Sequence, residues 1–239
     1  MILIYNDEGA SSVCVQALVD YLSTKHEIKC VSGYDLQKTD WMQHTAVLII
    51  PGGRSLPFYE TLGLQGNQHI REFVEQGGTY FGICAGAYYA CAETIFAEGL
   101  PLELKLHGAL HFFSGRAIGP VFADEDFTYD SEKGARVVDV QWQDGDIYSA
   151  YFNGGCYFDN HDVKTTVLAT YADNQKPAMI ACSVGLGRAI LSGIHPELSY
   201  ETIPNDSDPH HQYLRMQLMQ GDTNRVKMLS QLFDYIGIK

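Results

Sequence analysis

The first half of the chain alternates short apolar runs with segments whose apolar residues recur at helical spacing. Val15, Leu18, Val19 and Leu22, for example, fall on one face of a helix predicted over residues 12–23. We expect strands at residues 2–5, 27–31, 46–50 and 78–81. Further helical segments are expected near 35–43 and at 66–76. This alternation predicts a mostly parallel sheet with helices on both faces.

The second half changes to short strands with few helices. We expect strands at 109–113, 136–142, 147–152, 166–171, 178–183 and 187–192, the last two forming a hairpin. Residues 208–236 predict one or two helices that pack back on the sheet. The pattern as a whole predicts a single three-layer α/β domain over residues 1–239, with additional antiparallel strands in its second half.

Composition excludes several classes of function. A formal net charge of −13 argues against binding nucleic acid or an anionic membrane, because both need clustered Lys and Arg. No apolar run reaches the roughly 20 residues of a membrane helix. The N-terminus lacks the basic region and the cleavage site of a signal peptide, so we expect a cytoplasmic protein.

The segment Thr79–Ala87 carries the strongest chemical signal. It reads as a strand, then Gly82-Ile83-Cys84-Ala85-Gly86, then a helix expected to continue to Ala92. This is the pattern of a nucleophile elbow, in which glycines leave room for a sharp turn and the helix N-terminus favours a thiolate. The alternative is a small buried cysteine in a tight turn.

A base and an orienting acid follow a later strand. His195 comes directly after the strand predicted at 187–192, where open α/β sheets bind ligands, and Pro196 stiffens the turn. Glu197 can turn back and hold the imidazole tautomer, as the acid of a triad does. The alternative interpretation of these residues, taken in isolation, is a surface histidine beside a solvated glutamate.

Other residues at the same edge of the sheet are candidates for binding. Backbone N–H groups of Gly52 and Gly53 could join that of Ala85 in an oxyanion hole, although Pro-Gly-Gly is also common in ordinary turns. Arg54 could anchor a substrate carboxylate or face solvent. The loop containing Asn153 and Gly154 could line a pocket or be only a turn.

Neither a metal nor a cofactor is expected. The six cysteines, Cys14 among them, show no C-x-x-C spacing and are interpreted as separate thiols without a zinc or disulfide framework. We treat Cys14 as a thiol outside the site, suitable as a control for Cys84. No glycine-rich phosphate fingerprint follows the first strand, so we expect no nucleotide.

Pro-Gly-Gly, Gly-x-Cys-x-Gly and His-Pro-Glu, in this order, resemble the class I glutamine amidotransferase superfamily. The resemblance implies a flavodoxin-like fold. It also implies a triad of Cys84, His195 and Glu197, with Gly52, Gly53 and Ala85 at the oxyanion hole. The segments 2–6, 51–54, 82–88 and 151–156 are more closely similar to the amidotransferase-like N-terminal domain of biotin–protein ligases. No Gly-Arg-Gly-Arg motif is present, so we expect a stand-alone domain without the ligase catalytic part.

One position departs from working amidotransferases. Tyr88 stands four residues after the nucleophile, where these enzymes usually have a glutamine that helps build the substrate pocket. The Cys-Ala-Gly-Ala run is instead similar to the Ser-Ala-Gly-Ala elbow of serine dipeptidase and cyanophycinase relatives. We therefore predict an amidase that acts on a small amide. The alternatives are a non-catalytic binding or regulatory module with a protein partner, and a redox-responsive cysteine.

Overall fold

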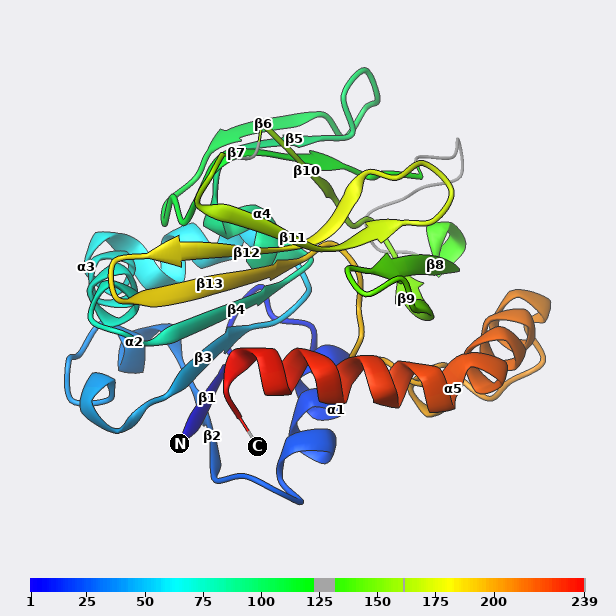
Figure 1. Ribbon diagram of the computed structural model, residues 1–239, viewed down its shortest axis with the longest axis horizontal. Helices are drawn as coiled ribbons and strands as arrows, with labels where there is room; N and C mark the ends of the chain where they lie inside the picture. Colours follow the sequence, from blue (N-terminus) through cyan, green and yellow to red (C-terminus); the bar gives the residue numbers. More distant parts are fainter. Residues whose placement is uncertain (123–131, 161, 239) are drawn as a thin grey trace.

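The computed structural model describes residues 1–122, 132–160 and 162–238 (Figure 1). Within these residues, nine strands form one sheet. Its parallel half runs in the order β2 (Ile28–Val31), β1 (Ile2–Tyr5), β3 (Val47–Ile50), β4 (Thr79–Ile83) and β13 (Gly187–Ser192). The antiparallel half continues with β12 (Pro177–Val184), β11 (Thr165–Tyr171), β8 (Arg136–Trp142) and β9 (Ile147–Phe152). The expected parallel sheet and the added antiparallel strands are thus confirmed as two halves of one sheet.

Helices cover both faces of this sheet. They are α1 (Ser12–Leu22), α2 (Gly33–Leu36), α3 (Ser55–Glu75), α4 (Ala85–Ala90) and α5 (Pro209–Ile236). In β1, Leu3 and Tyr5 belong to the core beneath α3 and α4, whereas Ile2 and Ile4 belong to the core beneath α1 and α5. Every residue of β1 is therefore buried, and the three-layer arrangement is confirmed (Figure 1).

A second, smaller sheet lies on the α4 side of the large one (Figure 1). In the described part of the chain it has four strands, in the order β10 (Tyr157–Asp159), β7 (Phe113–Gly119), β5 (Cys91–Phe96) and β6 (Leu104–His107). The helix expected to continue to Ala92 was wrong, because α4 ends at Ala90 and β5 begins at once. Short apolar runs do not distinguish a buried strand from a buried helix. The strand expected at 109–113 was also wrong, because residues 109–112 form a loop and β7 begins only at Phe113.

Other boundaries differ for identifiable reasons. The helix expected at 66–76 begins at Ser55 instead, and Gly63, at φ 59° and ψ −169°, interrupts it. The helical segment expected at 35–43 divides into α2 and a 3₁₀ turn at Met42–His44. The C-terminal region forms one helix, α5, whose first turn is capped by the Asp208 side chain. No helix in the described ranges combines the length and the apolar character needed to cross a bilayer.

The sheet order brings the candidate residues together. Strands β4 and β13 are parallel neighbours, with Ile83 paired with Ser192, so Cys84 and His195 follow them at the same edge. Strand β3 lies on the other side of β4 and delivers Gly52 and Gly53 to that edge. The candidate site therefore lies at the carboxyl end of the parallel half, where open α/β sheets bind their ligands.

Candidate active site

Cys84 occupies a strained turn between β4 and α4. Its φ of 48° and ψ of −103° lie where non-glycine residues are rare, and its N–H donates to the Ser192 carbonyl at 2.8 Å. A Cβ on Gly82 would lie 2.6 Å from the Gly86 oxygen, and one on Gly86 would lie 2.1 Å from the Ile50 oxygen. Both positions need glycine because a neighbouring carbonyl group lies too close to each of them for any side chain to fit. This is the geometry of a nucleophile elbow.

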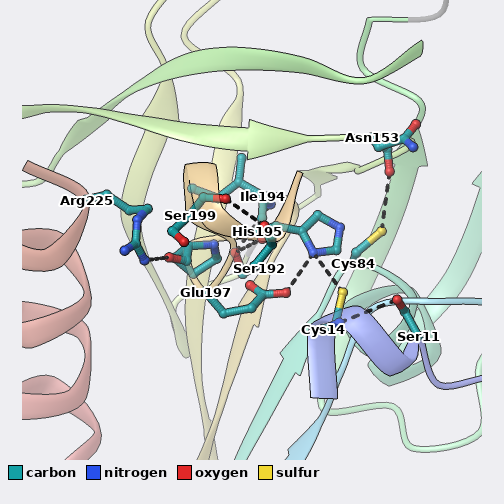
Figure 2. Close-up of polar contacts among 12 residues, drawn as sticks. Ser11, Cys14, Cys84, Asn153, Ser192, Ile194, His195, Glu197, Ser199 and Arg225 are labelled. Atoms are coloured by element: carbon teal, nitrogen blue, oxygen red, sulfur yellow. Dashed lines mark hydrogen bonds and ion pairs between the residues drawn. The ribbon is translucent and has the colours of Figure 1, made fainter. Parts of the chain in front are cut away.

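His195 and Glu197 form a buried pair. Nδ1 of His195 lies 2.8 Å from Oε1 of Glu197, and the two residues are 5% and 4% exposed. The loop that carries them is held from both sides: the His195 N–H donates to the Tyr151 carbonyl, and Nη1 of Arg225 in α5 donates to the Pro196 carbonyl at 3.0 Å (Figure 2). The pair is therefore oriented by fixed backbone contacts.

The groups around this pair make His195 a stronger base. Burial lowers the pKa of His195, but the Glu197 carboxylate, Cys14 and a hydrogen bond with Cys84 outweigh it and hold that pKa well above its usual value. Because Nδ1 faces Glu197, the opposite ring nitrogen, Nε2, is the atom available to exchange a proton with Cys84. The Cys84 sulfur also lies 3.9 Å from the Asn153 carbonyl (Figure 2).

Cys14 is a member of the cluster that the sequence did not identify. Its Sγ lies 3.6 Å from Nδ1 of His195, in the first turn of α1, whose N-cap is Ser11 (Figure 2). Burial raises the pKa of the Cys14 thiol. The prediction that Cys14 lies outside the site, and can serve as a control for Cys84, was therefore wrong. The only signal in the sequence was its place after the first strand, at the edge where the parallel strands end.

A cavity of about 560 Å³ opens beside these residues. Cys14, Cys84 and His195 line it, and so do most of the predicted binding residues: Gly53, Arg54, Ala85, Tyr88, Asn153 and Gly154. Gly52 does not line it. A Cβ on Gly52 would lie 2.4 Å from Cε1 of His195, so this glycine packs against the imidazole instead.

Two of the residues predicted to supply oxyanion-hole donors, Gly53 and Ala85, line this cavity. Among the described residues, no hydrogen bond uses the N–H of Gly53 or of Ala85. The Tyr88 hydroxyl, by contrast, donates to the Gly154 carbonyl at 3.0 Å, so these two residues shape the wall together. The site thus combines a cysteine on a strained turn, a buried histidine–glutamate pair, and backbone N–H groups without partners among the described residues.

Comparison with known proteins identifies the family. The sequence pattern of the family described as "Biotin-protein ligase, N terminal" matches residues 1–239. The chain belongs to this family. It is 33% identical over 253 residues to a biotin–protein ligase of Schizosaccharomyces pombe, which covers all of this chain but only 38% of the ligase. It is also 35% identical over 207 residues to an uncharacterized protein of Chlamydia muridarum, covering 82% of this chain and 80% of that protein.

Solved structures confirm the fold. A crystal structure of a glutamine amidotransferase superposes with a TM-score of 0.59 at 19% identity, covering 91% of this chain and 97% of that one. A glutamine amidotransferase from Thermotoga maritima gives a TM-score of 0.60 at 12% identity, covering 98% and 96%. The chain therefore has a class I glutamine amidotransferase-like fold, as the resemblance implied.

Proposed function

We propose that this protein is a cysteine-dependent amidohydrolase that acts on a small amide. The observation that carries the proposal is the placement of Cys84, on a strained turn at the wall of a cavity that is also lined by His195, which Glu197 orients. A strained backbone at a reactive side chain costs stability, and such strain is concentrated at functional sites. A purely structural cysteine needs neither the strain nor the partners.

In the proposed reaction, Cys84 Sγ bonds to the amide carbon as its proton passes to Nε2 of His195. The N–H groups of Gly53 and Ala85 stabilise the oxyanion. When the carbon–nitrogen bond breaks, the leaving amine takes the proton from His195, and a thioester remains on Cys84. Water then attacks the thioester and gives a proton to His195, which returns it to the sulfur. The products are a carboxylic acid, an amine and the free thiol.

The cavity suggests the kind of amide. Its volume of about 560 Å³ falls within the range of small-molecule sites. Arg54 lines it and can pair with a substrate carboxylate, while Tyr88, Phe96 and Leu104 supply apolar wall. Tyr88 stands where amidotransferases usually present a glutamine side chain, and the hydrogen bond from its hydroxyl to the Gly154 carbonyl holds the ring in the wall. This supports a small amide other than glutamine.

Intact-mass spectrometry with an electrophilic glutamine analogue, beside a panel of small amides and esters, tests the proposal. We expect a single adduct on Cys84 that is lost in Cys84→Ala and strongly slowed in His195→Ala. The matched control is Cys30→Ala, because Cys30 is exposed on β2, away from the site. No adduct with any probe, in folded protein, would refute the proposal.

A regulatory module is the second candidate, because the S. pombe relative is a biotin–protein ligase of which this chain matches 38%. In that case the cavity would bind a ligand or a protein partner without turnover. Cys84→Ala would then bind the partner as tightly as the unaltered protein, and no amide in the panel would be hydrolysed.

A further inference from the structure

We propose that Cys14, His195 and Glu197 form a binding site for a thiophilic divalent cation such as Zn²⁺, separate from the Cys84 sulfur. The three residues offer one thiol sulfur, one imidazole nitrogen and one carboxylate oxygen, and these atoms all lie within 4.8 Å of one another. Sulfur, imidazole nitrogen and carboxylate oxygen are the donors that zinc takes in proteins. All three residues are buried.

The distances fit a tetrahedral ion with little movement. Zinc bonds of about 2.3 Å to sulfur and about 2.0 Å to nitrogen or oxygen separate sulfur from nitrogen by about 3.5 Å, and nitrogen from oxygen by about 3.3 Å. The observed distance from Cys14 Sγ to His195 Nδ1 is 3.6 Å. The distance from Nδ1 to Glu197 Oε1 is 2.8 Å, so the carboxylate has to move by only about 0.5 Å.

A further observation points to a ligand. Oε2 of Glu197 is buried and has no hydrogen-bond partner among the described residues, so half of this carboxylate is available to a cation.

The charges also balance. A Cys14 thiolate and the Glu197 carboxylate together carry two negative charges, which match a divalent cation. Binding displaces the proton of the Cys14 thiol and shifts the single ring proton of His195 from Nδ1 to Nε2, so the affinity includes the cost of releasing the thiol proton. Mg²⁺ prefers a shell of oxygen ligands and is excluded by a sulfur–nitrogen–oxygen set.

Such an ion would inactivate Cys84 as a nucleophile, a consequence that rests on the proposed function. With the cation on Nδ1, the ring proton is on Nε2, which faces Cys84. His195 then cannot accept the thiol proton. Removal of the metal with a chelator would restore the reaction. The site would therefore couple amide hydrolysis to the availability of zinc.

Titration of the metal-free protein with Zn²⁺ against a chromophoric chelator, and with Co²⁺ by absorption spectroscopy, tests the binding directly. We expect one equivalent of Zn²⁺, a thiolate-to-cobalt charge-transfer band, and no competition by Mg²⁺. Cys14→Ser should weaken the affinity more than about tenfold, because a hydroxyl is a poor zinc ligand. Cys30→Ser is the matched control and should bind as the unaltered protein does.

Cys84→Ala separates this proposal from the proposed function. The variant loses the reaction with electrophiles, but it should bind Zn²⁺ and show the cobalt band unchanged. Circular dichroism checks that Cys14→Ser is folded, with Cys14→Ala as the second variant. The proposal is overturned if Zn²⁺ does not bind, if folded Cys14→Ser binds it equally well, or if Cys84→Ala abolishes the cobalt band.

Discussion

Gly52→Ala tests whether the position of the His195 imidazole controls the reactivity of Cys84. The added Cβ would lie 2.4 Å from Cε1 of His195, whereas carbon atoms in contact are normally about 3.5 Å apart. Gly52 has no left-handed backbone conformation, so alanine fits its backbone and the conflict is with the ring alone. We expect the imidazole to move by about 1 Å away from the new Cβ, which disturbs the positions of both ring nitrogens.

The displacement of the ring sets the size of the expected loss in reaction rate. A displacement of about 1 Å at reacting groups costs about 10²-fold in rate, which corresponds to about 2.7 kcal/mol in the barrier. The ring cannot avoid the Cβ freely, because Glu197 and Cys14 contact Nδ1 and the backbone of His195 is bonded to Tyr151. The loss should therefore appear in the rate of Cys84 modification.

The assay is the time course of Cys84 modification by the electrophilic glutamine analogue, followed by intact-mass spectrometry. Gly66→Ala is the matched control, because a Cβ at Gly66 in α3 would meet its nearest neighbour at an ordinary 3.4 Å. Urea unfolding establishes that both variants are folded. A folded Gly52→Ala protein that reacts at the rate of the control would refute the role assigned to the His195 position.

Three further predictions concern stability. Gly86→Ala should lower the free energy of unfolding by about 1–3 kcal/mol relative to Gly66→Ala, because its Cβ would lie 2.1 Å from the Ile50 carbonyl, and equal urea midpoints would contradict this. Arg225→Met should cost about 1–3 kcal/mol in the same assay, because it removes the donor to the Pro196 carbonyl and leaves Asp222 without its ion pair; an unchanged midpoint would count against this anchor. A hydrogen bond to Asp206 raises the pKa of His211. This pair therefore stabilises the folded protein fully below the unfolded pKa of about 6.5, and the stabilisation is lost as pH rises through the folded pKa. His211→Gln should remove this pH dependence of the free energy of unfolding, which is worth no more than about 1 kcal/mol at a surface pair.

The hydrophobic pattern predicted most strands of the large sheet, and short sequence motifs predicted the local parts of the site. Strands such as Arg136–Trp142, Ile147–Phe152 and Gly187–Ser192 were predicted with the boundaries that the structure has. The elbow around Cys84 and the two-residue spacing from His195 to Glu197 are also local, because neighbours in sequence are forced to be neighbours in space. The alternation of strands and helices predicted a mostly parallel sheet covered on both faces, but not the order of its strands.

Only the tertiary structure decided the contacts between distant segments. Cys14 meets His195 across 181 residues because β1 and β13 end at the same edge of the sheet, and no spacing in the sequence records this. Gly52 packs against the imidazole rather than lining the cavity for the same reason. The small sheet was missed because β5 follows α4 without a break, and packing rather than propensity makes Cys91–Phe96 a strand.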